Sequence, residues 1–543
     1  MSGAVETPVL IVGGGPVGFT LALDLARRGI RSTLAERDAG TALEVLAKAG
    51  TLNERTMEYC RWLGIADEII NVGFPDDHPR DVVYCTSLNG FVLGRDPLPS
   101  TKERVPPVQT PEMLRKCPQH LFDPLVAGAV ERAGHTNVLY GTEFESFTED
   151  YAGVTVTLRR HGSVPFTVRA RHLVGCDGAA SAVRRAAEIP FEGKQLDYSV
   201  SAMIRIEHLE DYHPLGRGER YMFVGTEGTW ANLTAVDGRA LYRLTMVGSE
   251  ERLSPEQLDM DALVRRALGR DDVPFEIVRV LPWRRSQFAA DRFRKGRVLL
   301  AGDAAHTTSP TGGHGLNTGL GDVSDLGWML AALLRGWGGA GLLDAYHAER
   351  RPVAIRNSAS STRNYGVWVQ SGGREHVLED SPLGEEQRQA IGARMSAMLR
   401  QEWHSLGVGM GYRYDSSPIV VPDGTPPTPD DASEYVPTAR PGHRAPHAWL
   451  AEGRSILDLF GDAFTLLRFG ADAPDTGPFV RAAEEAGLPL SVIDIQQPEI
   501  AKLYERRLVL VRPDGMVAWR GDSLPEDARS LVDVVRGAAE GNG

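Results

Sequence analysis

The chain has 543 residues, of which 42% are hydrophobic and 24% charged, and its formal net charge is −13 at pH 7. This length exceeds what one hydrophobic core supports, so the sequence predicts several domains. The negative charge disfavours nucleic acid as a partner, because phosphates are repelled over most of the surface. No apolar run reaches the roughly 18 residues of a membrane span, and the first residues lack the basic start of a signal peptide. We therefore expect a cytoplasmic protein with no membrane partner.

The cysteines indicate neither a metal site nor a redox pair. Cys60, Cys85, Cys117 and Cys176 show no C-x-x-C or zinc-type spacing, so no metal is predicted. Cys60 and Cys176 lie in apolar stretches typical of buried thiols. Four unpaired cysteines are compatible with a reducing compartment.

The N-terminal segment carries the first sign of nucleotide binding. An apolar run, residues 9–12, leads into Gly13, Gly15 and Gly18, which match G-x-G-x-x-G, and a helical pattern follows. Gly13 permits a tight turn, Gly15 lets the backbone approach a pyrophosphate, and Gly18 allows the helix to pack closely on the strand. A second strand pattern ends at Glu36, whose carboxylate can accept hydrogen bonds from a ribose diol. The segment predicts binding of FAD or NAD rather than NADP; a tight turn in an unliganded α/β unit is the alternative.

Two later segments predict further contacts to the same nucleotide. One strand pattern ends at Asp177, and a helix start with Ser181 and Arg184 follows it. The segment RVLLAGDAAH places Asp303 at the end of another strand, where its carboxylate can bind a ribityl or ribose hydroxyl. The Gly-rich stretch 309–319 then enters a helix whose free N–H groups would stabilise an electron-rich ring. Because no second G-x-G-x-x-G follows a strand, we expect a nicotinamide cofactor to dock only transiently.

Three motifs, in this order, resemble those of the single-component FAD-dependent aromatic hydroxylases, the family of para-hydroxybenzoate and phenol hydroxylases. They are GGGPVG, CDGAASAVR and GDAAHTTSPTGGHGLNTGLGDVSDL, and the likeness covers about residues 7–370. The resemblance implies an α/β fold with a Rossmann-type, glutathione-reductase-like FAD-binding domain and an inserted antiparallel-sheet substrate domain. It also implies the C-terminal thioredoxin-like α/β domain that the longer members carry.

The resemblance also assigns cofactor contacts residue by residue. Glu36 would hold the adenosine ribose, Asp303 the ribityl chain, and Pro310 would lie beside the reactive edge of the flavin. Pro310 and His314 are the candidate catalytic residues, although the family more often has glutamine or lysine at the position of His314. The expected cofactor-binding residues are Gly13, Gly15, Pro16, Gly18, Glu36, Arg37, Lys48, Gln119, Asp177, Arg184, Gly302, Asp303, Pro310, Gly313, Gly315, Leu316 and Asn317.

Some of these residues also fit a plainer role. His306 and His314 are typical of turn or helix-end histidines that are hydrogen-bonded to backbone. Asp177 is equally suited to cap a helix or to pair with Arg184. Lys48 stands where the family usually has arginine, and lysine lacks the bidentate geometry that arginine offers to phosphate.

The resemblance implies a reaction as well as a cofactor. NADH or NADPH would reduce bound FAD, dioxygen would add at the flavin C(4a) carbon, and the resulting hydroperoxide would oxygenate a small phenolic or other aromatic substrate. Short alternating runs between the second and third motifs predict antiparallel strands that roof the flavin. The residues expected to line the substrate pocket, each with plain core packing as its alternative, are Phe223, Trp230, Asn232, Tyr242 and Trp283. No catalytic base is identified.

The expected domain boundaries follow from these segments. The FAD-binding domain comprises residues 1–184, with an excursion to the substrate domain around 74–107, and residues 284–400, which include long helices. The substrate-binding sheet comprises residues 185–283. Residues 401–446, rich in proline and aspartate, form a connector. The thioredoxin-like domain comprises residues 447–543 and contains no cysteine, so packing or homodimerisation is its expected role.

Two alternatives remain open at this stage. The same scaffold could perform epoxidation, Baeyer–Villiger oxidation or oxygenation of a polycyclic polyketide. Outside enzymes, the chain could be a flavin-fold binding protein without turnover, which would bind no FAD or hold FAD that a nicotinamide cannot reduce.

Overall fold

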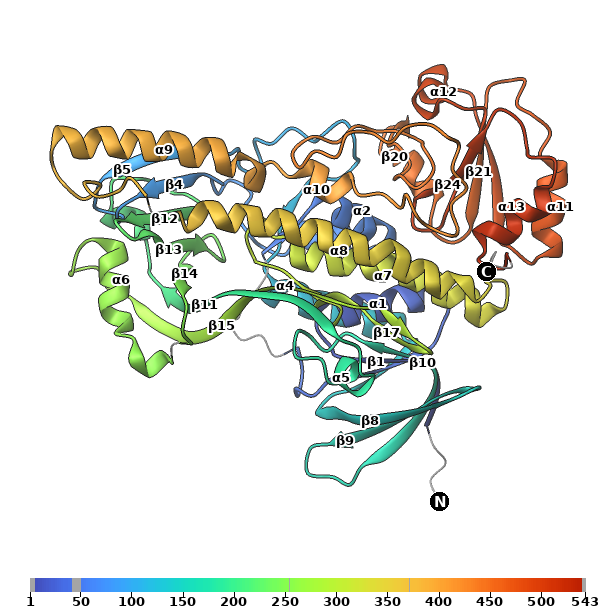
Figure 1. Ribbon diagram of the computed structural model, residues 1–543, viewed down its shortest axis with the longest axis horizontal. Helices are drawn as coiled ribbons and strands as arrows, with labels where there is room; N and C mark the ends of the chain where they lie inside the picture. Colours follow the sequence, from blue (N-terminus) through green and yellow to red (C-terminus); the bar gives the residue numbers. More distant parts are fainter. Residues whose placement is uncertain (1–4, 42–49, 253, 371, 540–543) are drawn as a thin grey trace.

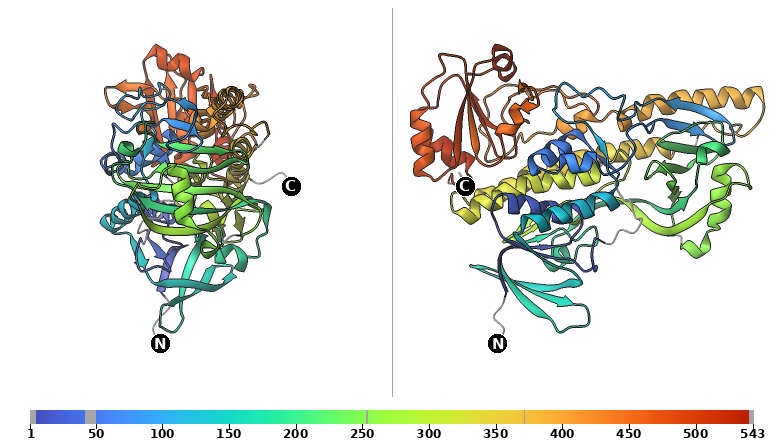
Figure 2. Two further views of the ribbon diagram at one scale, coloured as in Figure 1. Left: turned by 90° about the vertical axis from the view of Figure 1, so that its left-hand side faces the viewer. Right: turned by 180° about the vertical axis from the view of Figure 1, so that it is seen from behind.

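The computed structural model describes residues 5–41, 50–252, 254–370 and 372–539. Within these ranges the protein is α/β, with a mainly parallel sheet, an antiparallel sheet and a smaller C-terminal sheet (Figure 1). The antiparallel sheet and the C-terminal sheet lie at opposite ends of an elongated molecule, with the parallel sheet and two long helices between them (Figures 1 and 2). The predicted fold class is confirmed.

The parallel sheet brings the three predicted motifs to one edge. Its strand order is β16-β17-β10-β1-β2-β7, and β8 and β9 extend it as an antiparallel hairpin. Val12 of β1 is level with Gly175 of β10, which is level with Leu300 of β17. The strands are β1 Val5–Val12, β2 Ser32–Ala35, β7 Thr136–Leu139, β8 Thr142–Asp150, β9 Gly153–Arg160, β10 Phe166–Gly175, β16 Arg294–Lys295 and β17 Val298–Leu300. Because β1, β10 and β17 are parallel and end level, the turns that follow them lie side by side.

Helices cover this sheet and connect it to both ends of the molecule. α1 packs against α4 and α7, and α7 packs against α8. α7 and α8 run from the antiparallel sheet towards the C-terminal domain (Figure 1). The helices of this part are α1 Pro16–Arg27, α2 Glu54–Leu63, α3 Ala66–Ile70, α4 Gln119–Ala133, α5 Ala182–Ala186, α7 His314–Arg335 and α8 Gly341–Trp368; η3 is Gly302–Ala304, and the two-stranded β3 Thr51–Leu52 and β6 Arg115–Lys116 lie beside them.

The antiparallel sheet has the order β18-β15-β11-β14-β13-β12-β4-β5. β4 and β5 come from the excursion around 74–107, and β15 crosses the expected boundary at 283–284. α6 covers one face with an apolar core, and α9 packs on the other face near β4 and β5. The elements are β4 Val82–Cys85, β5 Val92–Asp96, β11 Phe191–Arg205, β12 Arg220–Gly225, β13 Gly228–Ala235, β14 Leu241–Ser249, β15 Glu276–Ala290, β18 His306–Thr307, α6 Met260–Leu268, α9 Pro382–Trp403, η1 Leu209–Tyr212 and η2 Pro255–Gln257.

The C-terminal sheet has the order β22-β21-β23-β24, with β21 parallel to β22 and antiparallel to β23. β21, β23 and β24 are mostly buried in apolar cores, whereas the edge strand β22 is largely exposed. The elements are β19 Trp449–Ala451, β20 Arg454–Ser455, η4 Ile456–Leu459, β21 Phe464–Phe469, α11 Gly477–Glu485, β22 Leu490–Ile495, α12 Pro498–Tyr504, β23 Leu508–Val511, β24 Val517–Gly521 and α13 Ala528–Val535.

The expected connector is packed against the rest of the protein. It contains α10, Leu406–Met410, and is otherwise mostly irregular. Tyr414 is buried, and its hydroxyl donates to Asp325 of α7. Arg444 forms a buried ion pair with Glu58 of α2. The irregular backbone is therefore fixed by polar contacts to the helices beneath it.

One of these contacts makes stability depend on pH. Burial raises the pKa of Asp325 to about 8; Arg350 opposes this rise, and the carboxylates of Asp514 and Glu349 add to it. Asp325 is thus protonated when folded at neutral pH but ionised when unfolded, so its contribution is fully present below its ordinary value of 3.8 and is lost as pH rises through about 8. We expect Asp325→Asn, a neutral isostere, to gain stability relative to wild type as pH rises from 5 to 9. Thermal melting across this range measures the difference, and a difference that does not change with pH contradicts the assignment.

Three further features bear on the predicted class of protein. All four cysteines are free and buried, as predicted for Cys60 and Cys176. Among the described residues, no helix is both long enough and apolar enough to cross a bilayer. The same residues contain no cluster of three or more histidine, cysteine or acidic side chains suited to a metal ion.

Candidate functional site

The first glycine turn has the predicted shape. Gly13 has φ +108°, and a Cβ there would lie 2.4 Å from the carbonyl oxygen of Cys176. A Cβ on Gly18 would lie 1.9 Å from the carbonyl oxygen of Gly13, so this glycine allows α1 to pack against the turn. A Cβ on Gly15 would meet no atom within 4 Å, so the space beside it is open to a ligand. Pro16 begins α1, where its missing N–H costs no helical hydrogen bond.

Glu36 lies beside this turn, at the end of β2. Its Oε2 accepts from the backbone N–H of Gly14 at 2.5 Å, and its Oε1 accepts from that of Asp38 at 2.8 Å. The carboxylate is therefore held where a ribose diol would reach it. Arg37 is exposed and faces Asp38 at 3.9 Å. Lys48 lies outside the described residues.

The side chains of Asp177 and Arg184 form hydrogen bonds with backbone groups of the protein. Asp177 accepts from the Ser181 hydroxyl at 2.5 Å and from two backbone N–H groups at the start of α5, so it caps that helix. Arg184 donates to the carbonyl of Ala304 at 2.9 Å and stacks on Phe191 at 3.8 Å. Arg184 thus fastens the second motif to the third, and Asp177 has the cap role that the sequence left open.

The third motif turns sharply at Gly302, which has φ +61°. Its backbone N–H donates to Oδ2 of Asp322 at 3.0 Å, and His306 Nε2 donates to the same oxygen at 2.7 Å. Asp303 follows and is exposed at the end of β17. His306 is therefore the hydrogen-bonded turn histidine of the plainer interpretation, with a carboxylate as partner, and the buried Asp322 fixes the turn that carries Asp303.

The start of α7 lies next to this turn. Gly313 has φ +69° and faces open space, while Gly315 and Leu316 are partly exposed. Asn317 accepts from the N–H of Asn53 at 2.9 Å, and its amide donates to the carbonyl of Thr51 at 3.0 Å. The side chain of Asn317 thus ties α7 to β3 and α2, and the backbone at the helix start remains available to a ligand.

Gln119 and Pro310 complete the predicted cofactor contacts. Gln119 begins α4, and its amide donates to Asp123 at 3.1 Å. Pro310 is exposed in the loop before α7. The turns of the three motifs therefore meet at one sheet edge. Open space beside Gly15 and Gly313, and the two helix starts that follow them, fit a pyrophosphate and an electron-rich ring.

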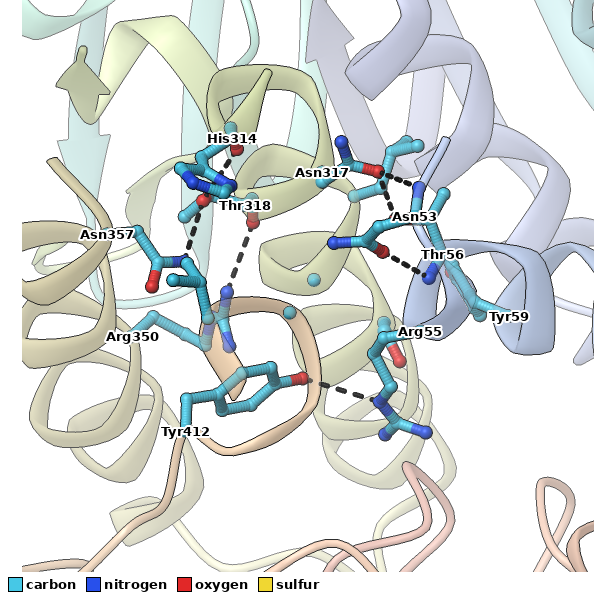
Figure 3. A pocket seen from close by; sticks show the side chains of 15 residues that line it. Asn53, Arg55, Thr56, Tyr59, His314, Asn317, Thr318, Arg350, Asn357 and Tyr412 are labelled. Carbon is cyan, nitrogen blue, oxygen red and sulfur yellow. Dashed lines mark hydrogen bonds between the residues drawn. The ribbon is translucent and has the colours of Figure 1, made fainter. Parts of the chain in front are cut away.

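His314, unlike the exposed Pro310, is buried. It is only 3% exposed, and burial lowers the pKa of its imidazole to about 4, so it is neutral at pH 7. It contributes to a pocket lined by α2, α7, α8 and α10 (Figure 3). Asn317, Arg350 and Tyr412 line the same pocket. These surroundings give no support to a catalytic role for His314.

The five expected substrate residues divide between two faces of the antiparallel sheet. Phe223, Trp230 and Tyr242 belong to the apolar core beneath α6, where Phe223 and Trp230 stack at 5.6 Å. Asn232 and Trp283 lie on the opposite face, and the Trp283 indole donates to Ser201 at 2.9 Å. Because side chains alternate along a strand, Phe223 cannot share a face with Met222, the partner of Asn232. Phe223, Trp230 and Tyr242 therefore lie in the apolar core, the alternative role expected for them from the sequence.

The face of Trp283 carries a buried charged cluster that the sequence did not reveal. Arg285 donates to Asp197 at 3.3 Å and to the Ser309 hydroxyl at 2.9 Å. Tyr365 of α8 donates to Asp197, and the Arg285 guanidinium lies 4.4 Å from the Tyr365 ring. Arg285 thus connects the sheet to the residue immediately before Pro310.

A second acid lies on the other side of the same loop. Glu402 of α9 accepts from the backbone N–H of Gly312 at 3.3 Å, from Arg220 at 3.3 Å and from the Trp368 indole at 2.9 Å. Burial raises the pKa of Glu402, and Arg220 opposes this rise. Burial, together with Arg220 and Arg285, lowers the pKa of Arg243 to about 10. The loop before α7 is therefore held by Arg285 at Ser309 and by Glu402 at Gly312, and these two side chains pair in turn with Asp197 and Arg220.

Comparison with known proteins agrees with this geometry. Residues 6–361 match the FAD binding domain family, and residues 438–539 match the aromatic-ring hydroxylase C-terminal domain. Phenol 2-monooxygenase of Pseudomonas sp. (strain EST1001) is 31% identical, over 98% of this chain and 93% of the relative. Tetracenomycin A2 monooxygenase-dioxygenase of Streptomyces glaucescens is 31% identical, over 96% of this chain and 95% of that relative.

A solved structure is similar over the whole chain. The rebeccamycin biosynthetic enzyme RebC with reduced flavin superposes with a TM-score of 0.91 at 39% identity, covering 99% of this chain and 100% of RebC. The predicted resemblance and the predicted cofactor FAD are confirmed. The chain belongs to the FAD-dependent aromatic-ring hydroxylases, a family of flavoprotein monooxygenases.

Proposed function

We propose that this monooxygenase hydroxylates a phenolic ring, using NADH or NADPH as reductant and dioxygen as oxidant. The observation that carries the proposal is the cluster of arginines and aromatic rings beside the Ser309–Gly312 loop. When bound, FAD supplies the redox chemistry, accepting two electrons from the nicotinamide and activating dioxygen. One oxygen atom enters the substrate ring and the other leaves as water.

The residues around the loop support a phenol as substrate. Arg243 and Arg285 provide positive charge where the phenol oxygen would become anionic, which stabilises the reacting form. Asp197 and Glu402 are each held by several donors, so they serve to orient the arginines and the loop. The arginines thus favour the ionised phenol without a dedicated carboxylate base.

The walls of the cluster support an aromatic ring. The Arg285 guanidinium lies 4.9 Å from the Trp283 ring and 6.0 Å from the Trp368 ring. Arg285, Asp197 and Ser309 are buried, and a site closed to water protects reactive oxygen species from solvent. Asn232 and Trp283 remain our candidates for substrate contact on this face, and Pro310 remains our candidate beside the flavin.

A second candidate reaction is oxygenation of a larger natural product on the same scaffold. The names of the relatives favour it, since tetracenomycin A2 monooxygenase-dioxygenase and the rebeccamycin enzyme RebC match this chain over nearly its whole length. Epoxidation or Baeyer–Villiger oxidation would use the same cofactor. Cytoplasmic location and a homodimer remain predictions; the four buried free thiols favour a reducing compartment.

Stopped-flow reduction of the purified flavoprotein tests the proposal. We expect NADH or NADPH to bleach the flavin absorbance faster when one compound in a panel of phenols and polycyclic aromatics is present. The compound that accelerates reduction distinguishes the simple phenol from the larger natural product. Equal rates with every aromatic compound would overturn the proposal. Flavin that neither nicotinamide reduces would overturn it in favour of a binding protein without turnover.

A further inference from the structure

The turn between β23 and β24 of the C-terminal domain inserts charged side chains beneath α7 and α8. Arg512 is fully buried and donates to both carboxylate oxygens of Glu349 on α8, at 2.5 and 2.8 Å. Asp514 accepts from Arg512 and from the indole of Trp328 on α7 at 2.8 Å. One turn of the C-terminal domain therefore holds both long helices.

From α8 the contacts continue to the turn of the third motif, at Gly302. Arg350, next to Glu349 in the chain, donates to Oδ1 of Asp322 at 2.9 Å. Oδ2 of Asp322 accepts from the N–H of Gly302 and from His306, the contacts that fix the third motif. Two buried ion pairs, joined by adjacent residues of one helix, thus connect the C-terminal domain to the turn that carries Asp303.

The connector holds the middle of this chain of contacts. Arg350 also donates to the Tyr414 hydroxyl at 2.9 Å and to the carbonyl of Thr318 at 3.1 Å. Tyr414 in turn donates to Asp325, three residues after Asp322 on α7. The guanidinium of Arg350 is therefore held by three partners at once, Asp322, Tyr414 and the carbonyl of Thr318.

The charges in this chain depend on one another. The carboxylates of Glu349, Asp514 and Asp322 are buried with the guanidinium groups of Arg512 and Arg350. Loss of Arg512 removes the guanidinium that bridges the buried carboxylates of Glu349 and Asp514. A buried charge that loses its partner is costly, so the neighbouring side chains rearrange or admit water.

We propose that Arg512 is a positioning residue for the flavin, and that the C-terminal domain sets FAD affinity by fixing the turn at Gly302 through Glu349, Arg350 and Asp322. This gives a role in cofactor binding to a domain that contains no cysteine and so performs no dithiol chemistry. The inference rests on FAD binding alone and holds whichever substrate the enzyme oxygenates.

The test compares two buried arginines of the C-terminal domain in the full-length protein. Arg512→Met removes the first link of the chain. Arg520→Met is the matched control, because Arg520 is 4% exposed and donates to Asp423 and Thr425 of the connector, at 2.6 and 3.3 Å, and to Glu505 of its own domain at 2.8 Å. FAD dissociation constants are measured by flavin fluorescence well below each melting temperature. We expect Arg512→Met to weaken FAD by about tenfold, and Arg520→Met to lower the melting temperature with less than a twofold change in FAD affinity.

A double-mutant cycle separates positioning from general destabilisation. Asp322→Asn breaks the last link, so adding Arg512→Met to it should weaken FAD by less than about twofold. Arg512→Lys keeps the positive charge but loses the two-pronged guanidinium contact with Glu349, so its FAD affinity should lie between those of Arg512→Met and wild type. It replaces Arg512→Met in the cycle if that variant does not fold. The proposal is overturned if the effect of Arg512→Met is the same with and without Asp322→Asn, or if Arg520→Met weakens FAD as much. Because each readout is FAD affinity, failure of the proposed hydroxylation leaves this test unaffected.

Discussion

Gly15→Val is expected to give a folded protein that no longer retains FAD. Gly15 has φ −81°, which any residue adopts, and a Cβ there meets no atom of the protein within 4 Å. The added side chain therefore costs the apoprotein little, but it occupies the space through which a pyrophosphate reaches the start of α1. We expect FAD affinity to fall at least about 100-fold, close to 3 kcal/mol.

Two other glycines make this result specific. Gly13→Ala should destabilise the apoprotein itself, because its Cβ would lie 2.4 Å from a backbone oxygen and its φ is +108°. Gly366→Ala, inside α8 and facing open space, should leave FAD affinity unchanged. Visible absorbance of the purified variants and FAD titration of their apoproteins measure both effects. A Gly15→Val protein that purifies with full flavin would place the pyrophosphate elsewhere.

Arg285→Met is expected to reduce kcat/KM by about 100-fold or more. The substitution leaves Asp197 without its buried cation and removes the hydrogen bond from Arg285 to Ser309, next to Pro310. It also removes positive charge from the place where we expect the phenol oxygen to ionise, so reduction of the flavin should become uncoupled from oxygenation. Product formed per nicotinamide consumed measures that coupling, and Arg285→Lys should restore part of it.

A buried arginine on α9 provides the control for that experiment. Arg388 is 3% exposed, stacks on Phe91 at 3.9 Å and donates to backbone carbonyls, away from the Ser309–Gly312 loop. Arg388→Met should lower the melting temperature and leave coupling intact. Equal losses of coupling in the two variants would mean that Arg285 acts only through stability.

The cofactor site was largely predictable from the sequence, because it is built by local patterns. Each of the three motifs is a strand followed by a turn, and parallel strands bring such turns to one edge. The backbone demands at Gly13 and Gly302 are also local, since a turn with positive φ favours glycine. Side-chain roles were less predictable: for Asp177 the sequence offered contact with the cofactor, a helix cap or a pair with Arg184, and only the structure shows that it caps α5.

The substrate face could not be assigned in the same way. The alternation of side chains along β12 and β13 places Phe223 and Asn232 on opposite faces of the sheet. This assignment requires the strand register and the bulge between Phe223 and Val224, which the sequence does not show. The buried arginines are harder still, because an arginine in a sequence resembles any surface arginine. Arg285 pairs with an acid 88 residues away, and Arg512 pairs with Glu349, 163 residues away, as well as with the nearby Asp514; no local pattern encodes the distant partners.

The origin of the oxygen atom in the product tests the central claim most directly. Once the stopped-flow panel has identified a substrate, turnover under ¹⁸O-labelled dioxygen followed by mass spectrometry shows where that atom comes from. The account predicts that each product molecule gains one ¹⁸O atom from dioxygen and no oxygen atom from the solvent. Product that takes its new oxygen from labelled water instead would contradict monooxygenation by this site.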